Sequence, residues 1–133
     1  MVNSFQVESA RPQVLIGGVL NLLKAEGLVV FVLCTAAYFH MGGGGLMYLV
    51  LFLAPDLAMA GYARGPKVGA FIYNIFHTYV GPAMLAGAGF YFVPEAVPFA
   101  LIWAAHIGMD RVFAYGLKYP EAFSSNHLNP VER

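Results

Sequence analysis

The amino-acid sequence predicts an all-α integral membrane protein, an up-and-down bundle of four transmembrane helices with both termini in the cytoplasm. Hydrophobic residues make up 59% of the 133 positions and charged residues only 11%, whereas soluble domains carry roughly 25% charged residues. The apolar residues gather into four long segments, and most lysines and arginines lie near one end of these segments. This pattern indicates that the lipid bilayer is the partner of most of the chain.

Each apolar segment is near the length of about 20 residues with which a helix crosses a bilayer. The predicted membrane domain covers residues 14–118, between a polar N-terminal segment (1–13) and a cytoplasmic C-terminal tail (119–133). The four spans are expected at 14–41, 45–63, 66–92 and 95–118. Pro66 suits the first turn of the third helix. Pro55 removes a backbone hydrogen bond inside the second, which predicts a kink there.

The basic residues orient the predicted bundle. Those at or near its cytoplasmic side are Arg11, Arg64, Lys67, Arg111, Lys118 and Arg133. The two turns on the other side, HMGGGG (40–45) and FVPEAVP (92–98), contain no lysine or arginine. By the positive-inside rule, the termini and the turn at 64–67 are therefore cytoplasmic. The expected location is the bacterial cytoplasmic (inner) membrane, as a multi-pass protein.

The composition also argues against other classes of protein. The formal net charge is zero, so the clustered basic face of a nucleic-acid-binding protein is not expected. Cys34 is the only cysteine, which excludes an internal disulfide. Small residues at Ala83, Gly87 and Gly108 offer close packing within or between protomers, so a homo-oligomer is a further expectation.

Ionisable side chains line up at one depth of the predicted bundle, although such residues are costly inside a membrane. With a rise of about 1.5 Å per residue, Asp56 lies ~12 Å and His77 ~15 Å from the cytoplasmic ends of their helices. On the fourth helix Asp110 lies ~12 Å and His106 ~18 Å from that end, and Glu26 reaches ~12 Å on the first. All four helices therefore place an acid or a histidine in the cytoplasmic half.

Neighbouring polar residues share the faces of this layer. His106 and Asp110 are spaced i, i+4, and Asn74 and His77 are spaced i, i+3, so each pair lies on one face of its helix. Trp103 extends the face of His106. The remaining candidate ligand-binding residues around the layer are Tyr73, Tyr79, Tyr115 and Arg111, the last of which is expected at its edge.

Three interpretations of the layer remain open. In the first, the layer binds a transition metal such as iron, zinc or manganese, because inward-facing histidines and carboxylates build metal centres in four-helix bundles. The metal ligands would be Glu26, Asp56, His77, His106 and Asp110. In the second, His77, His106 and Asp110 are acid–base catalysts of a metal-free pocket. In the third, the layer is a structural or proton-conducting hydrogen-bond network.

Several long motifs carry a family resemblance. LFLAPDLAMAGYARGPKVGAFIYNIFHTYVGP, followed by WAAHIGMDRVFAYGLKYPEAF and by HL, resembles the bacterial membrane proteins grouped as domain-of-unknown-function family 4260 over roughly residues 20–128. The resemblance implies a small four-helix integral membrane protein and no established activity. The positions that match its polar motifs are Asp56, Tyr73, Asn74, His77, Tyr79, His106, Asp110, Arg111, Tyr115, Lys118 and His127.

The function expected from these residues is a metal-binding membrane enzyme, an oxidoreductase or hydrolase that acts on a small apolar or amphiphilic molecule. The alternatives are a binding or transport module for small solutes or protons, and an accessory subunit of a larger membrane complex. For the tail, one hypothesis folds His127 back as a lid or third imidazole of the layer, and the other leaves a disordered terminus.

Overall fold

The computed structural model describes residues 17–120, 123–124 and 126–128. In this part of the chain the secondary structure is helical, apart from an isolated antiparallel bridge between Lys118 and Asn126. The all-α prediction is thus confirmed for the described residues. The polar segment 1–13, the start of the first predicted span at 14–16 and the end of the tail at 129–133 lie outside them.

The helices follow the four apolar segments of the sequence. In chain order they are α1 (Gly17–His40), α2 (Gly45–Phe52), the 3-10 helix η3 (Ala54–Arg64), α3 (Pro66–Phe76), α4 (Val80–Tyr91), the 3-10 helix η4 (Pro94–Ala96) and α5 (Val97–Val112). Two continuous helical stretches, Gly17–His40 and Gly45–Arg64, are long and apolar enough to cross a membrane, with mean hydropathies of 1.8 and 1.6.

Two of the predicted spans change near a proline. The second changes from α-helix to 3-10 helix at Ala54, next to Pro55, where the missing N–H predicts a kink. The third, expected to be continuous over 66–92, breaks between Phe76 and Val80. Pro82 accounts for this break, because its ring clashes with the carbonyl four residues earlier, and it is tolerated only in the first turn of a new helix.

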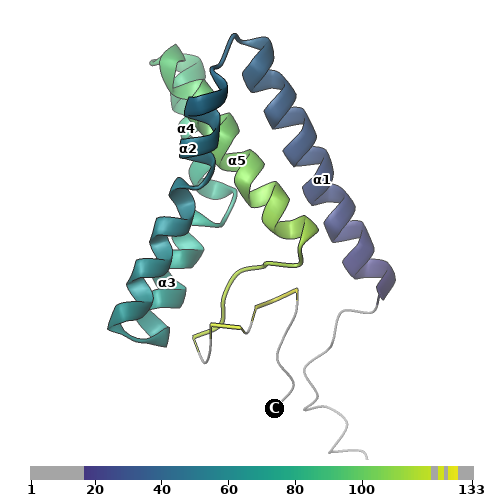
Figure 1. Ribbon diagram of the computed structural model, residues 1–133, viewed down its shortest axis with the longest axis vertical. Coiled ribbons are helices and arrows are strands. Elements are labelled where there is room, and N and C mark those ends of the chain that lie inside the picture. Colours follow the sequence, from purple (N-terminus) through teal and green to yellow (C-terminus); the bar gives the residue numbers. More distant parts are fainter. Residues whose placement is uncertain (1–16, 121–122, 125, 129–133) are drawn as a thin grey trace, which may run out of the picture.

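The fourth span is shorter than expected. It was predicted to run to residue 118, but α5 ends at Val112. Ala114 follows with a φ of 60°, the left-handed conformation that ends helices. Residues 115–120 consequently run as an extended segment beside the bundle (Figure 1).

Helix α5 is central to the packing. It contacts α1, α4 and α2, while η3 packs against α3, and Figure 1 shows α1 and α5 side by side. The two helices approach each other closely at two glycines, because a Cβ on Gly108 would lie 2.6 Å from the carbonyl oxygen of Gly27. Gly108, expected to pack helices within or between protomers, thus packs α5 against α1 of the same chain.

The outward-facing side chains of the described helices are strongly apolar. Leu46 is 78% exposed, Met84 71% and Phe90 78%, and along the whole of α1 only Gly27 and Tyr38 are buried. Soluble monomers rarely expose apolar surface on this scale. The exterior therefore has the character expected of helices that face lipid.

We predict that Gly108→Ala lowers the free energy of unfolding by about 1–3 kcal/mol, the range for overpacking, because the new Cβ would collide with the backbone of α1. Denaturant unfolding in detergent measures this change. Gly87→Ala on α4 is the control, since its Cβ would meet no atom within 4 Å, and alanine favours a helix. Equal stability of the two variants would contradict the close contact between α1 and α5.

Candidate functional site

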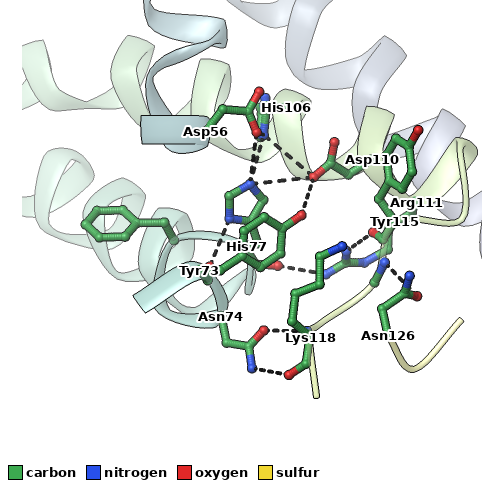
Figure 2. Close-up of polar contacts among 12 residues, drawn as sticks. Asp56, Tyr73, Asn74, His77, His106, Asp110, Arg111, Tyr115, Lys118 and Asn126 are labelled. Atoms are coloured by element: carbon green, nitrogen blue, oxygen red, sulfur yellow. Dashed lines mark hydrogen bonds and ion pairs between the residues drawn. The ribbon is translucent and has the colours of Figure 1, made fainter. Parts of the chain in front are cut away.

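Two imidazoles and a carboxylate from separate parts of the chain converge on one point (Figure 2). Nε2 of His77 lies 3.2 Å from Nε2 of His106. Oδ1 of Asp56 lies 3.5 Å from the first nitrogen and 3.4 Å from the second. His77 follows the last residue of α3, His106 lies on α5, and Asp56 lies on η3. The break in the third span therefore places one of the three groups.

A second carboxylate borders the same point. Oδ2 of Asp110 lies 3.6 Å from Nε2 of His77 and 3.7 Å from Nε2 of His106. The hydroxyl of Tyr73 donates a hydrogen bond of 3.2 Å to that same oxygen. The side chains of His77 and His106 are 0% and 4% exposed, whereas that of Asp56 is 41% exposed. The cluster is thus closed on the histidine side and open beside Asp56.

The backbone sets the orientation of the His77 ring. Its Nδ1 lies 2.9 Å from the carbonyl oxygen of Tyr73, and a carbonyl can only accept, so Nδ1 carries the proton. The tyrosine ring also stacks on the imidazole, with centroids 3.6 Å apart and planes within 6°. In the neutral ring the lone pair of Nε2 then points at the cluster, which is how a protein presents a histidine to a metal.

These separations are those of ligands around one small cation. Zinc–nitrogen bonds are about 2.0–2.1 Å long, so four tetrahedral ligand atoms around the ion lie roughly 3.3 Å from one another. The distances among Asp56, His77 and His106 are 3.2–3.5 Å. The three side chains form a group that could hold a metal ion, and imidazole with carboxylate suits iron, zinc or manganese.

Two side chains of α5 bind the backbone at the break after α3. Nε1 of Trp103 donates to the carbonyl of Phe76 at 2.6 Å, and Nη2 of Arg111 donates to the carbonyl of His77 at 2.7 Å. A helix end leaves such carbonyls without intrahelical partners. Trp103 and Arg111, predicted as ligand-binding residues, thus hold the backbone that carries His77. Arg111 also donates to the carbonyl of Tyr115 at 2.5 Å.

The segment after α5 is tied to α3 by one amide side chain. Oδ1 of Asn74 accepts from the backbone N–H of Lys118 at 2.6 Å, and its Nδ2 donates to the carbonyl of Lys118 at 2.9 Å. On the other side, Nδ1 of His127 accepts from the N–H of Leu117 at 2.7 Å. Asn74, predicted as a ligand contact, therefore binds the backbone of the chain that leaves α5.

Cavities formed by described residues lie around these side chains. An apolar one of about 210 Å³ is lined by Leu51, Ala54, Pro55, Phe76, Leu85, Phe99 and Trp103. A second, of about 310 Å³, reaches the cluster itself and is lined by Asp56, Met59, Tyr73, Asp110, Tyr115, Lys118 and Phe123. We call it the lysine cavity. A third, of about 340 Å³, is lined by Leu23, Glu26, Gly27, Val30, Tyr79, Arg111, His127 and Leu128.

The structure does not bring every predicted site residue to the cluster. Glu26, predicted as a metal ligand, faces the third cavity together with Tyr79 and His127. Glu26 lies on α1, which packs against α5 through the neighbouring residue Gly27. Glu26 therefore has the same depth as the cluster in the predicted bundle but does not face it. His127 does fold back, but onto this cavity, where burial and then the charge of Arg111 lower its pKa.

Three residues that line the cavity at the cluster, Met59, Lys118 and Phe123, were absent from the predicted site. Lys118 was taken from the sequence as a marker of the cytoplasmic end of the fourth helix, yet it is 8% exposed and lines the lysine cavity. Only the YGLKYP motif pointed to it. The positive-inside pattern had already accounted for its charge, and its burial follows from the early end of α5.

The comparisons with known proteins agree with the motifs. The model of a family described as a domain of unknown function, DUF4260, matches residues 20–131. The chain belongs to this family. No curated protein and no solved structure matches the DUF4260 chain. Membership adds no activity, so function has to be argued from the cluster and the cavities around it.

We predict that Asn74→Ala raises the hydrogen-exchange rate of the Lys118 amide at least about tenfold, since the lost bond is worth roughly 1.4 kcal/mol and local opening governs exchange. Exchange mass spectrometry in detergent measures the rate. Asn21→Ala, at an exposed position of α1, is the control and should leave it unchanged. An unaltered rate in Asn74→Ala would mean that Asn74 does not hold this segment.

Proposed function

We propose that this protein is a metal-dependent membrane enzyme whose metal is bound by Asp56, His77 and His106 in the cytoplasmic half of the bilayer. The observation that carries the proposal is the convergence of two imidazole nitrogens and a carboxylate oxygen within 3.5 Å of one another. Iron, zinc and manganese are the metals that suit this set of donors.

The proposed metal would lie among atoms that attract a cation. In the neutral ring Nε2 of His77 presents a lone pair, and the carboxylate oxygens of Asp56 and Asp110 are acceptors as well. Nε2 of His106 lies within hydrogen-bond distance of Nε2 of His77, at 3.2 Å. Among the described residues, Nδ1 of His106 is a buried atom with no hydrogen-bond partner. Nδ1 lies across the ring from Nε2, so a cation in the cluster would not pair with it, and the atoms that would hold the cation are the Nε2 and carboxylate acceptors.

The surroundings of the cluster support an enzyme more than a structural metal site. Three protein ligands leave coordination positions for water or substrate, as in catalytic sites. A bound divalent ion would supply a Lewis acid and an activated water. Asp110, whose carboxylate is oriented by the Tyr73 hydroxyl, is placed to accept a proton beside it. The reaction class is accordingly a hydrolysis or an oxidation.

The substrate we propose is small and apolar or amphiphilic. The apolar cavity includes Pro55 and Phe76, the residues that immediately precede Asp56 and His77. The lysine cavity borders the cluster from the polar side. The apolar part of an amphiphilic molecule would therefore fit the apolar cavity, and its polar part would fit the lysine cavity.

We predict that detergent-purified protein holds about one equivalent of iron, zinc or manganese by elemental analysis. His77→Ala and His106→Ala should each weaken binding more than about 100-fold, since disturbing the groups that merely orient a ligand costs about 10–100-fold. His40→Ala, at the exposed end of α1, is the matched control. A metal-free wild type whose proton flux in liposomes depends on His77 would overturn the proposal in favour of a proton-conducting network.

We further propose four membrane spans, with both termini in the cytoplasm of the bacterial inner membrane. In a Cys34→Ala background, a membrane-impermeant maleimide applied to intact cells should label Gly44→Cys but leave Lys67→Cys unlabelled until the membrane is opened. Both positions are exposed and lie on opposite sides by the positive-inside rule. Equal labelling of the two in intact cells would contradict this topology.

A further inference from the structure

A buried lysine remains without a function once the cluster has been described. Lys118 is 8% exposed, yet among the described residues no carboxylate oxygen lies within ion-pair distance of its ammonium and no acceptor receives a hydrogen bond from it. A buried charge is costly unless it is paired. This unpaired cation is the feature that a ligand would complete.

The protein holds the lysine in place by its backbone and its neighbours. Asn74 binds both the N–H and the carbonyl of Lys118, and the residue forms a bridge with Asn126. The ammonium lies 4.4 Å from the ring centroid of Phe123 and 5.3 Å from that of Tyr73. Cation–π attraction offsets part of the cost of burial and uses no hydrogen-bond donor, so all three donors remain available to a ligand.

The lysine cavity connects this cation with the cluster. Lys118, Tyr115 and Phe123 contribute to its walls, as do Asp56 and Asp110 of the cluster. Its volume of about 310 Å³ is at the lower end of the range for small-molecule sites. A ligand that reaches the lysine in this cavity therefore also lies beside the proposed metal.

We propose that Lys118 is an anion-binding residue, and that the lysine cavity takes a small amphiphile whose carboxylate or phosphate group pairs with its ammonium. The aromatic and methionine side chains of the cavity, Met59, Tyr73, Tyr115 and Phe123, contact the apolar part of this molecule. That this amphiphile is the substrate rests on the proposed function, whereas its binding to Lys118 does not. The anionic end of the amphiphile is thereby assigned to the side of the cavity away from the histidines.

The test is isothermal titration of the full-length protein in one nonionic detergent with four probes: octanoate, octyl phosphate, octanol and inorganic phosphate. The wild type should bind octanoate or octyl phosphate at least about tenfold more tightly than octanol, the expected worth of a charge-assisted hydrogen bond. Lys118→Met should abolish this preference and leave octanol binding unchanged, whereas Lys118→Arg should retain most of it. Lys67→Met, at an exposed lysine, is the matched control.

Several outcomes would overturn the proposal. Equal affinity of the wild type for octanoate, octyl phosphate and octanol would show that Lys118 does not bind the anionic group. A preference that survives in Lys118→Met would place the anion elsewhere. Inorganic phosphate binding as tightly as octyl phosphate would make the ligand a free anion and contradict an amphiphile. Unfolding curves of each variant establish that Lys118→Met is folded before it is titrated.

Titrations before and after metal removal by chelation separate this inference from the proposed function. If the purified protein holds no metal but its preference for octanoate over octanol requires Lys118, the anion site stands and the metal proposal fails. If the metal binds and depends on His77 while Lys118→Met changes no probe affinity, the metal site stands and the anion site fails.

Discussion

The site depends on the interruption of the third helical segment at His77. Pro82 offers no N–H to the carbonyl of Thr78 and its ring clashes with that carbonyl, which favours a break here, and α3 ends one residue before the histidine. The two carbonyls freed there are bound by Trp103 and Arg111 of α5. These bonds join the break to the central helix, so the backbone that carries one imidazole is held against the helix that carries the other.

Tyr73 links the remaining groups of the site. Its carbonyl accepts from the Nδ1 of His77, its ring stacks on that imidazole, and its hydroxyl donates to Asp110. The same ring lies 5.3 Å from the ammonium of Lys118. One residue of α3 thereby contacts an imidazole, a carboxylate and a cation. This explains how a chain with few polar residues keeps a polar cluster ordered inside an apolar protein.

Much of the candidate site follows from counting residues along the helices. Two carboxylates and two histidines were expected at one level: Asp56, Asp110, His77 and His106. In the structure an oxygen of each carboxylate lies within 3.7 Å of Nε2 of both histidines. The counting works because helical rise is constant. It does not give the rotation of a helix about its axis relative to its neighbours, and for that reason Glu26 reaches the level but faces another cavity.

The sequence by itself determined the helical class, the four apolar segments, the change in the second helix near Pro55 and the depth of the polar layer, because hydropathy and helical geometry are local properties. Only the tertiary structure decided which side chains meet. The meeting of the two imidazoles, the early end of α5 and the burial of Lys118 each depend on contacts between residues far apart in the chain. Those contacts arise where Gly27 and Gly108 let two helices touch and where Asn74 binds the segment that follows α5, and no local pattern encodes them.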